Sequence, residues 1–420
     1  MNALSKNITT KNNVIGAFLG TVVEYYDYGL FAFSASIIAA KFFVASDHTT
    51  ALINVFGIYA LGYFAKPLGA LIFSKIGDKY GRKVALNITI FGIAVPTVII
   101  GLLPTYESIG IWSAVALSIC RFAQNLFIGG EYDGAAIYVI EHLGQKYRYT
   151  ASAITRSMCG FGLLIGVSAT NFFNSTLFIK YDFAWRIPFL LALPLAIITA
   201  YYRKQLIETP DFGIVQQHNL DFQSISQVLK RQWKVVAMVA LFAGGFGVTY
   251  QISVMFMKQY LPMVLPESKL IISTFSTILV ACFGVAMIVS GVLADYFGNV
   301  RVIKFSLIFV ILSIILLVIA ISYQILNLSL MAALMVAIFV APFNGLAHGI
   351  VIKMFPINER YRCISIGHTI GSMLMSGSAG YVCLTCMKTY NLPLFPLFYI
   401  LIFAFVSYIM VHIFAQRLSN

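Results

Sequence analysis

The sequence predicts an all-α, polytopic membrane protein with twelve transmembrane helices, arranged as two pseudo-symmetric bundles of six. Three observations support this fold class. Of the 420 residues, 60% are hydrophobic and 10% are charged, and the mean hydropathy is +0.88, whereas about 25% of residues are charged in soluble domains. Twelve apolar stretches approach or exceed the ~20 residues that cross a bilayer. A charged turn in the first half of the chain also recurs in the second half.

The apolar stretches divide the chain into two groups of six with a polar segment between them. We expect a first bundle in residues 1–205, a cytoplasmic linker in 206–233 and a second bundle in 234–420. The fourth stretch is long and the sixth is short, so we expect tilted or kinked helices there. The stretches are 14–40, 51–73, 84–103, 110–139, 150–178, 187–202, 234–257, 270–294, 302–323, 328–352, 363–385 and 392–415.

The charged turn runs from Gly77 to Lys83, between two apolar stretches. So few residues between two spanning helices predict a tight antiparallel hairpin, and Gly81 permits the sharp backbone turn. Asp295 and Gly298 repeat the spacing of Asp78 and Gly81, again just after an apolar stretch. This repeat predicts that the two halves of the chain are structurally related.

The distribution of charge predicts the orientation in the membrane. Most of the Lys and Arg residues fall in loops on the side that both termini share, which is typical of the cytoplasmic side. The net charge of +13 is therefore explained by topology, and no nucleic-acid partner is expected. Cys383 and Cys386 have the spacing of a redox or metal site but lie inside a spanning stretch, so we interpret them as packing residues. We expect no metal or cofactor.

The first stretch contains two carboxylates, Glu24 and Asp27. Carboxylates inside a membrane are costly and rarely face lipid. At i, i+3 the two share one helix face, and two like charges this close favour protonation of at least one of them. The alternative is a structural role, with the carboxylates capped by neighbouring Tyr hydroxyls or paired with a cation.

Other polar residues lie deep within apolar stretches. Arg121 is too deep to reach the membrane surface, so we expect it to pair internally or to bind an anion. Glu131 is a second buried carboxylate on the same stretch. The neutral groups that could shape a binding pocket through hydrogen bonds are Tyr25, Tyr28, Gln124, Tyr250 and Gln251.

The sequence leaves two possible positions open for each of two cations, Lys66 and Arg156. Lys66 either belongs to the polar network of the first half or extends toward the cytoplasmic surface. Arg156 either adds positive charge to a central cavity or pairs with Glu141 at the cytoplasmic end. If both cations face the cavity, a di- or tricarboxylate substrate is favoured over a zwitterion. His348 and His368 are candidates for proton coupling, although packing is the commoner role of a single His in a helix.

Several sequence strings resemble a known family. Asp78 to Lys83 resembles the signature loop between helices two and three of the major facilitator superfamily, with Ser74 in place of the first glycine of the pattern. The string from Trp185 to Leu191 and the string from Glu208 to Phe212 resemble its metabolite:proton symporter branch, which includes proline/betaine, α-ketoglutarate, citrate and shikimate permeases. The resemblance covers nearly the whole chain.

This resemblance implies a function and a set of roles. We expect a secondary transporter in the bacterial inner membrane, working as a monomer and taking up a small hydrophilic metabolite, most simply a zwitterion, together with protons. An uncoupled facilitator or an exporter is the alternative, and nothing in the sequence indicates an enzyme. Proton coupling is expected at Glu24, Asp27, Arg121 and Glu131, and substrate binding at Tyr25, Tyr28, Lys66, Arg121, Gln124, Arg156, Tyr250 and Gln251. A cytoplasmic gate is expected at Asp78, Arg82, Glu141 and Asp295.

Overall fold

The computed structural model of the 420-residue chain is helical, and no strand occurs in the residues that it describes. The described residues are 19–44, 47–80, 82–129, 136, 139–140, 145–175, 177–178, 180–203, 225–265, 269–355 and 357–419.

The described part of the first half contains six spanning segments, several of them interrupted. The first is helical over residues 19–33 and continues, after Ser34, as α2 (Ala35–Phe42). The second is interrupted in the same way at Phe64, just before Pro67. The remaining elements are α3 (His48–Tyr63), α4 (Ala65–Tyr80), α5 (Arg82–Leu102), α6 (Tyr106–Ile109), α7 (Trp112–Ile128), η1 (Gln145–Tyr147), α9 (Arg148–Phe173), η2 (Ala184–Arg186), α10 (Ile187–Leu190) and α11 (Ala192–Arg203).

The second half also contains six spanning segments. Two of them include a π-helical turn in the middle of the span, η3 (Gln251–Phe256) and η6 (Ser372–Ser376). Such turns are rare in proteins, and those that occur often lie at functional sites. The other elements are α13 (Ile225–Tyr250), α14 (Met257–Val264), α15 (Lys269–Phe297), α16 (Asn299–Ser322), α17 (Leu326–Gly345), α18 (Ala347–Val351), η5 (Ile352–Met354), α19 (Ile357–Gly371), α20 (Ala379–Thr389) and α21 (Phe395–Ser419).

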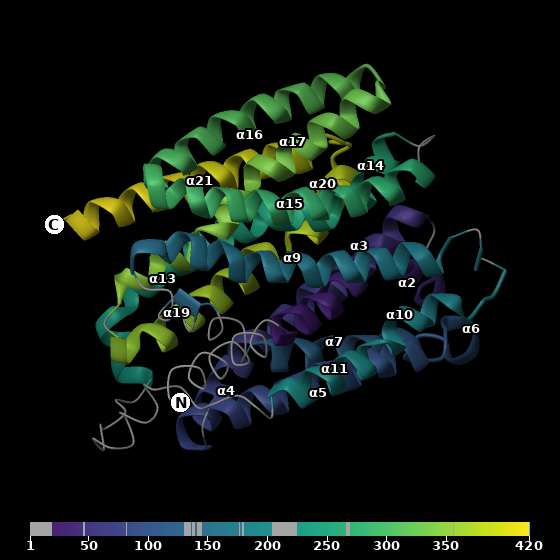
Figure 1. The fold of residues 1–420 in the computed structure, drawn as a ribbon. Helices are drawn as coiled ribbons and strands as arrows, with labels where there is room; N and C mark the ends of the chain where they lie inside the picture. The colour runs from purple at the N-terminus through teal and green to yellow at the C-terminus, as the bar shows by residue number, and fades with distance from the viewer. Residues whose placement is uncertain are drawn as a thin grey trace, which may run out of the picture.

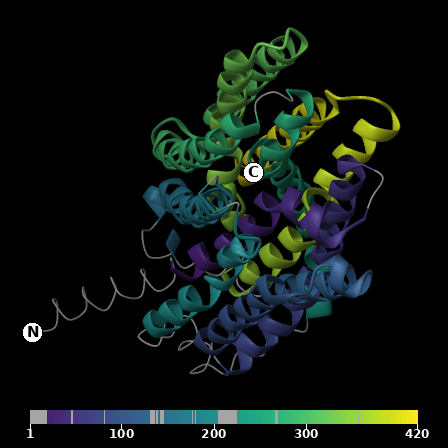
Figure 2. The same ribbon diagram turned by 90° about the vertical axis from the view of Figure 1, so that its right-hand side faces the viewer.

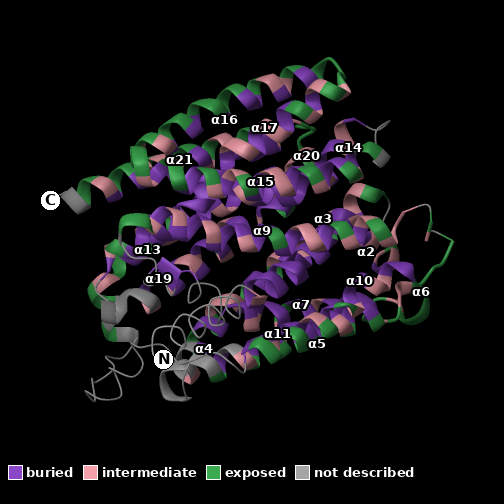
Figure 3. Ribbon diagram, in the orientation of Figure 1, coloured by how far each residue is buried: buried purple, intermediate pink, exposed green. Residues whose placement is uncertain are grey.

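Helix length and burial agree with a membrane protein. Within the described ranges, nine of the twelve spans are long and apolar enough to cross a bilayer by themselves. The other three are the helix of 19–42, α5 and α7. Figure 3 shows buried residues on the inner faces of the helices and exposed ones on the outer faces. Many of the exposed residues are large and apolar, such as Leu312 and Phe305 on α16, as expected for a lipid-facing surface.

The two turns that predicted the internal repeat occupy matching places, each between two long helices. A single residue separates α4 from α5, and a single residue, Gly298, separates α15 from α16. Gly298 has a φ of +88°, a conformation that residues with a Cβ rarely adopt; Gly81 itself lies outside the described residues. The linker predicted in 206–233 is described only from Ile225, where α13 already begins, so its last residues are part of the seventh span.

The helices of the two halves run side by side along one common direction (Figures 1 and 2). The closest packing between the halves is that of α9 on α15. Helix α4 of the first half also contacts α19 of the second, and α3 contacts α20. We name two ends of this bundle. The basic end holds the joint after Tyr80 and the C-terminus, on the left in Figure 1, and the opposite end holds the start of α3 and the end of α20.

Candidate functional site

A central cavity lies between the two halves. Its empty volume is about 760 Å³, part of which is open to solvent. Six aromatic side chains line it, together with one described carboxylate (Glu24) and two cations (Lys66 and Arg156). The aromatic residues are Tyr25, Tyr28, Tyr63, Phe246, Tyr250 and Phe283. This combination is suited to a small ligand that carries charge and an apolar body.

A network of tyrosines connects the cavity wall to the other half of the chain. The hydroxyls of Tyr28 and Tyr63 form a hydrogen bond. Gln251 Oε1, on η3, accepts hydrogen bonds from the Tyr28 hydroxyl at 3.1 Å and from the Tyr59 hydroxyl at 3.3 Å. The Lys66 ammonium lies 3.9 Å from the centroid of the Tyr63 ring and 5.3 Å from that of Tyr28. Lys66 therefore lines the cavity, one of the two alternatives left open by the sequence.

Asp27 belongs to a separate buried cluster between the first helix, α5 and α7. Its Oδ1 accepts hydrogen bonds from Thr97 Oγ1 and, at 2.8 Å, from Gln124 Nε2. Gln124 Oε1 in turn accepts a hydrogen bond from Arg121 Nη1 at 2.8 Å. The Arg121 guanidinium is fully buried, 4.3 Å from the centroid of the Phe31 ring. Asp27 Oδ2 has no hydrogen-bond partner among the described residues.

The two carboxylates of the first helix therefore have different surroundings. Glu24 lines the cavity, whereas Asp27, Arg121 and Gln124 are absent from its lining. A spacing of three residues separates side chains by about 60° around a helix. That angle is enough to direct Glu24 into the cavity and Asp27 toward α5 and α7.

Arg156 lies in the cavity wall, close to two aromatic side chains and two histidines. It donates a hydrogen bond to the Tyr25 hydroxyl at 3.5 Å, and its guanidinium is 5.5 Å from the Phe246 ring centroid. A smaller pocket of about 220 Å³ joins Arg156 to His348 and His368, whose ring centroids are 6.2 Å apart. Arg156 therefore contributes positive charge to the cavity.

One hydroxyl in the cavity wall makes no hydrogen bond to a described residue. The Tyr250 hydroxyl is buried and has no hydrogen-bond partner among the described residues, although its ring lines the cavity and packs against Phe283. A buried hydroxyl without a partner is costly, so it marks a place where a bound molecule or water gains a hydrogen bond.

Close backbone approaches fix the helices that carry these side chains. A Cβ at Gly69 on α4 would lie 1.7 Å from the Leu126 carbonyl oxygen of α7, and one at Gly129 would lie 2.1 Å from the Lys66 carbonyl oxygen. A Cβ at Gly162 on α9 would lie 2.3 Å from the Val22 carbonyl oxygen of the first helix, and Gly162 and Gly166 form the GxxxG spacing that lets helices approach closely. Small residues thus let the helices that bear Asp27, Lys66 and Arg121 pack tightly.

At the basic end, Asp295 joins the two halves. Its carboxylate accepts hydrogen bonds from the backbone N–H groups of Tyr149 at 3.1 Å and Thr150 at 2.8 Å, and from Thr150 Oγ1 at 2.5 Å. Asp295 on α15 therefore caps the first turn of α9, and the negative charge is favourable at the positive end of that helix. Ser152 Oγ on α9 also donates to the Gly345 carbonyl at 2.7 Å.

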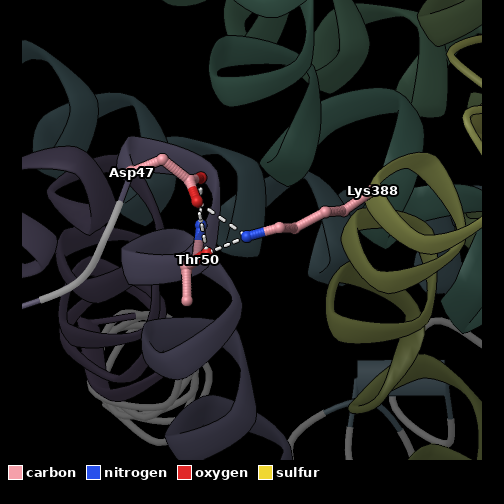
Figure 4. A network of polar contacts seen from close by, with 3 residues as sticks. All are labelled: Asp47, Thr50 and Lys388. Carbon is pink, nitrogen blue, oxygen red and sulfur yellow. Dashed lines mark hydrogen bonds and ion pairs between the residues drawn. The ribbon is translucent and has the colours of Figure 1, made fainter.

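At the opposite end, Asp47, Thr50 and Lys388 form a second contact between the halves (Figure 4). Asp47 caps α3 by accepting from the Thr50 backbone N–H at 2.9 Å, and it also pairs with the Lys388 ammonium at 2.7 Å. Lys388 also bonds to the Thr50 hydroxyl. Contacts between the halves are therefore present at both ends of the bundle.

Four of the residues expected from the sequence cannot be placed by their side chains. Glu131 and Glu141 lie outside the described residues, and Asp78 on α4 and Arg82 on α5 are described only as positions in their helices. Three residues were not anticipated: Thr97, Tyr59 and Tyr63. Tyr59, Tyr63 and Lys66 follow an i, i+4, i+7 pattern, a spacing that indicates one helix face. Thr97 is harder to identify from the sequence, where it is only a single hydroxyl residue beside Pro96 in an apolar stretch.

Comparison with known proteins gives relatives over nearly the whole chain. The chain is 29% identical over 417 residues to the proline/betaine transporter of Escherichia coli (strain K12), covering 94% of this chain and 81% of the relative. It is 28% identical over 425 residues to the glycine betaine/proline/ectoine/pipecolic acid transporter OusA of Dickeya dadantii (strain 3937), covering 97% and 83%.

Solved structures show the same fold at low sequence identity. The crystal structure of a D-xylose-proton symporter superposes with a TM-score of 0.74 at 15% identity, covering 96% of this chain and 97% of that one. The transporter FucP in its outward conformation gives a TM-score of 0.68 at 13% identity, with 96% and 99% covered. These proteins are all transporters, in agreement with the expectation that the chain is not an enzyme. The sequence also matches the Major Facilitator Superfamily over residues 17–380, and the chain belongs to this family.

Proposed function

We propose that the protein is a proton-coupled importer of a small zwitterion of the proline or betaine type, acting as a monomer in a bacterial inner membrane with both termini cytoplasmic. The bacterial relatives named for proline and betaine support this substrate class. The observation that carries the proposal is the cavity itself, because it places a carboxylate, two cations and an aromatic wall around one small volume.

Each part of a zwitterion has a complementary group in this cavity. Lys66 and Arg156 would attract the substrate carboxylate, because both side chains are cationic. The ammonium or quaternary ammonium group would face Glu24 and the rings of Tyr25 and Tyr250, because such cations bind to aromatic faces. Tyr28 would shape the wall, while Gln251 would hold Tyr28 in position from the second half.

Coupling to protons would use the buried cluster beside the cavity. A proton on Asp27 Oδ2 would neutralise a carboxylate that lies inside the membrane, where charge is costly. Gln124 transmits the state of Asp27 to Arg121, because each of its amide ends bonds to one of them. Uptake is coupled if protonation changes which arrangement of these helices binds the substrate, so that proton and substrate cross together. Glu24 and Glu131 remain further candidates for this role.

Alternating access would use the two inter-half contacts. Asp295 would close the cytoplasmic side while it caps α9, and Asp78, Arg82 and Glu141 would complete that gate. The repeat of Asp and Gly between the two joints supports a matching role for Asp78 in the first half.

One observation favours a second substrate class. Two cations and a single described carboxylate line the cavity, which also suits a dicarboxylate such as α-ketoglutarate. Transport by a facilitator or an exporter remains the alternative to coupled uptake.

Uptake into proteoliposomes with an imposed inward proton gradient separates these possibilities. Labelled proline, betaine, α-ketoglutarate and citrate are offered in parallel to the wild type, to Asp27→Asn, and to Asp182→Asn as a control that removes the charge of an exposed carboxylate. We expect accumulation of proline or betaine by the wild type and by Asp182→Asn, and its loss in Asp27→Asn with exchange retained. Accumulation of α-ketoglutarate alone would establish the second class, and equilibration that ignores the gradient would refute coupling.

A further inference from the structure

The second half carries a large groove on its outer surface, away from the central cavity. Helices α15, α16 and α17 form it, and its empty volume is about 1590 Å³, including space that is open to the surroundings. Its walls are almost entirely apolar. Val285 and Val289 of α15 and Phe305 of α16 are 62%, 51% and 63% exposed. The groove therefore opens toward the lipid of the membrane.

The groove results from the small side chains of α15. Ala281, Ala286 and Ser290 face the groove, so little side-chain volume fills the space between α15 and α16. Helix α15 packs closely on α9 and α17 but only sparsely on α16, which lies at the outer edge of the second half (Figure 1). The groove floor is closed by Phe309 and Phe339, whose rings stack with centroids 4.7 Å apart.

The dimensions of the groove match an acyl chain. Its lining on α15 runs from Ala281 to Phe297, which is about 24 Å of helix at 1.5 Å per residue. One leaflet of the hydrocarbon core is about 15 Å deep. An extended lipid tail therefore fits along the groove, parallel to α15.

The groove has one cationic end. Arg301, in the first turn of α16, lines it at the basic end. Its side chain is exposed, and its guanidinium makes one long hydrogen bond, 3.5 Å to the Phe297 carbonyl. Across the described ranges no carboxylate forms an ion pair with it. The groove thus combines an apolar length with a positive charge that no described protein group neutralises.

We propose that this groove is a binding site for an anionic phospholipid. The tail lies between α15 and α16 against Val285, Val289 and Phe309, and the headgroup phosphate pairs with Arg301. An anionic headgroup is favoured over a zwitterionic one because a zwitterionic headgroup brings its own cation next to Arg301. One Arg beside anionic lipid contributes about 1 kcal/mol of attraction, which corresponds to about a fivefold preference for an anionic over a zwitterionic lipid.

The site lies on a helix that also serves the gate. Asp295 on α15 caps α9, whereas Phe297, two residues further, lines the groove on another face of the same helix. A lipid that fills the space between α15 and α16 would therefore hold the helix that bears the Asp295 contact.

Native mass spectrometry of the full chain tests the proposal. Delipidated protein is mixed with equal amounts of phosphatidylglycerol and phosphatidylethanolamine with the same acyl chains. The wild type should retain one phosphatidylglycerol with about fivefold preference. Arg301→Gln should lose this preference, while Lys304→Gln, which removes an exposed cation outside the groove on the same helix, should keep it. Ala286→Phe, which fills the groove, should lower retention of both lipids.

Several outcomes would overturn the proposal. Equal retention of the two lipids by the wild type, or an undiminished preference in Arg301→Gln, would remove the headgroup assignment. Unchanged retention in Ala286→Phe, with thermal unfolding showing that the variant is folded, would remove the tail assignment, as would displacement of the lipid by millimolar inorganic phosphate. A persistent dimer without lipid would assign the groove to a second copy of the chain instead.

Discussion

Gln124 connects a buried carboxylate to a buried guanidinium, with one hydrogen bond to Asp27 and one to Arg121. An amide side chain suits this position because it offers a donor and an acceptor on opposite sides. Its removal would take one hydrogen bond from each of these charged groups in a low-dielectric region, where a lost hydrogen bond is costly.

We therefore predict that Gln124→Leu, which keeps similar volume, destabilises the protein by about 1–3 kcal/mol. Thermal unfolding of the purified protein in detergent measures the effect. Ser118→Ala is the matched control on α7, because among the described residues the Ser118 hydroxyl bonds only to the Ala114 carbonyl of its own helix. Its loss should change the unfolding temperature little. Equal unfolding temperatures for the two variants would contradict the connecting role.

The Tyr250 hydroxyl is predicted to contact the substrate. Tyr250→Phe should raise the KM for uptake by about 2- to 12-fold, the equivalent of one neutral hydrogen bond, with the unfolding temperature unchanged. Tyr260→Phe makes the same chemical change at another buried hydroxyl without a described partner, but outside the cavity lining. Initial uptake rates over a range of substrate concentrations should leave Tyr260→Phe like the wild type. A matching KM in both variants would remove Tyr250 from the binding site.

At the scale of single residues, the sequence predicted which residues belong to the site better than it predicted which of them lie together. Six of the residues expected in the pocket or the proton site line the cavity: Glu24, Tyr25, Tyr28, Lys66, Arg156 and Tyr250. The separation of Glu24 from Asp27 could not be predicted, because residue spacing gives the angle between two side chains but not the helices that they face. Thr97 was missed for the same reason, since only its contact with Asp27 distinguishes it from other buried hydroxyls.

At the scale of helices, contact between backbones decides which substitutions are tolerated. Gly69 on α4 lies against the Leu126 carbonyl of α7, whereas a Cβ at Gly57 on α3 would meet the Tyr381 ring at 3.6 Å, an ordinary van der Waals distance. Both glycines lie in the second span, and both are followed by further helix.

We predict that Gly69→Ala separates α4 from α7 and lowers the unfolding temperature or abolishes folded expression, since a Cβ there would lie 1.7 Å from a backbone oxygen that cannot move alone. Gly57→Ala should be neutral or slightly stabilising, because Ala favours helix over Gly by about 1 kcal/mol. Size-exclusion profiles and thermal unfolding of both variants test this. A well-folded Gly69→Ala protein with unchanged stability would contradict the tight packing of α4 on α7.

The helices themselves were largely predictable, because hydropathy reports directly on which segments lie in lipid. Most predicted stretches agree with the observed spans within a few residues; for example, 302–323 corresponds to α16 (Asn299–Ser322). The break at Leu191 between α10 and α11 lies in the sixth stretch, where a tilted or kinked helix was expected. The two π-helical turns were not predicted, because neither η3 nor η6 contains a proline or glycine that would signal them.

At the scale of the whole molecule, the described residues join the two halves by one carboxylate-centred contact at each end. Asp295 binds the start of α9 at the basic end, and Asp47 binds Lys388 at the opposite end. If the halves rock about the central cavity, one contact must break whenever the cavity opens to that side. Weakening the contact at one end should therefore favour the conformation that is open at that end, so the two contacts should shift the population in opposite directions.

Accessibility of Cys159, which lines the cavity, tests this in a variant that retains Cys159 as its single cysteine. Lys388→Ala should raise its labelling by an impermeant maleimide in intact cells by up to about fivefold, the limit for a surface ion pair. Asp295→Ala should raise labelling in inverted vesicles by about 2- to 30-fold, from the cost of losing a helix cap. Lys41→Ala breaks an exposed ion pair within the first half, to Asp182, and should change neither rate. Increases on the same side for both variants would refute opposed gates.

The two contacts differ in what their loss costs. When Lys388 leaves Asp47, the carboxylate keeps its cap on α3, and water replaces the ammonium, since the two side chains are already 41% and 44% exposed. When Asp295 leaves α9, the N–H groups of Tyr149 and Thr150 lose their acceptor. Of these two contacts, the one at the opposite end therefore costs less to break. If the basic end is cytoplasmic, this difference favours opening toward the medium, the side from which an importer takes its substrate.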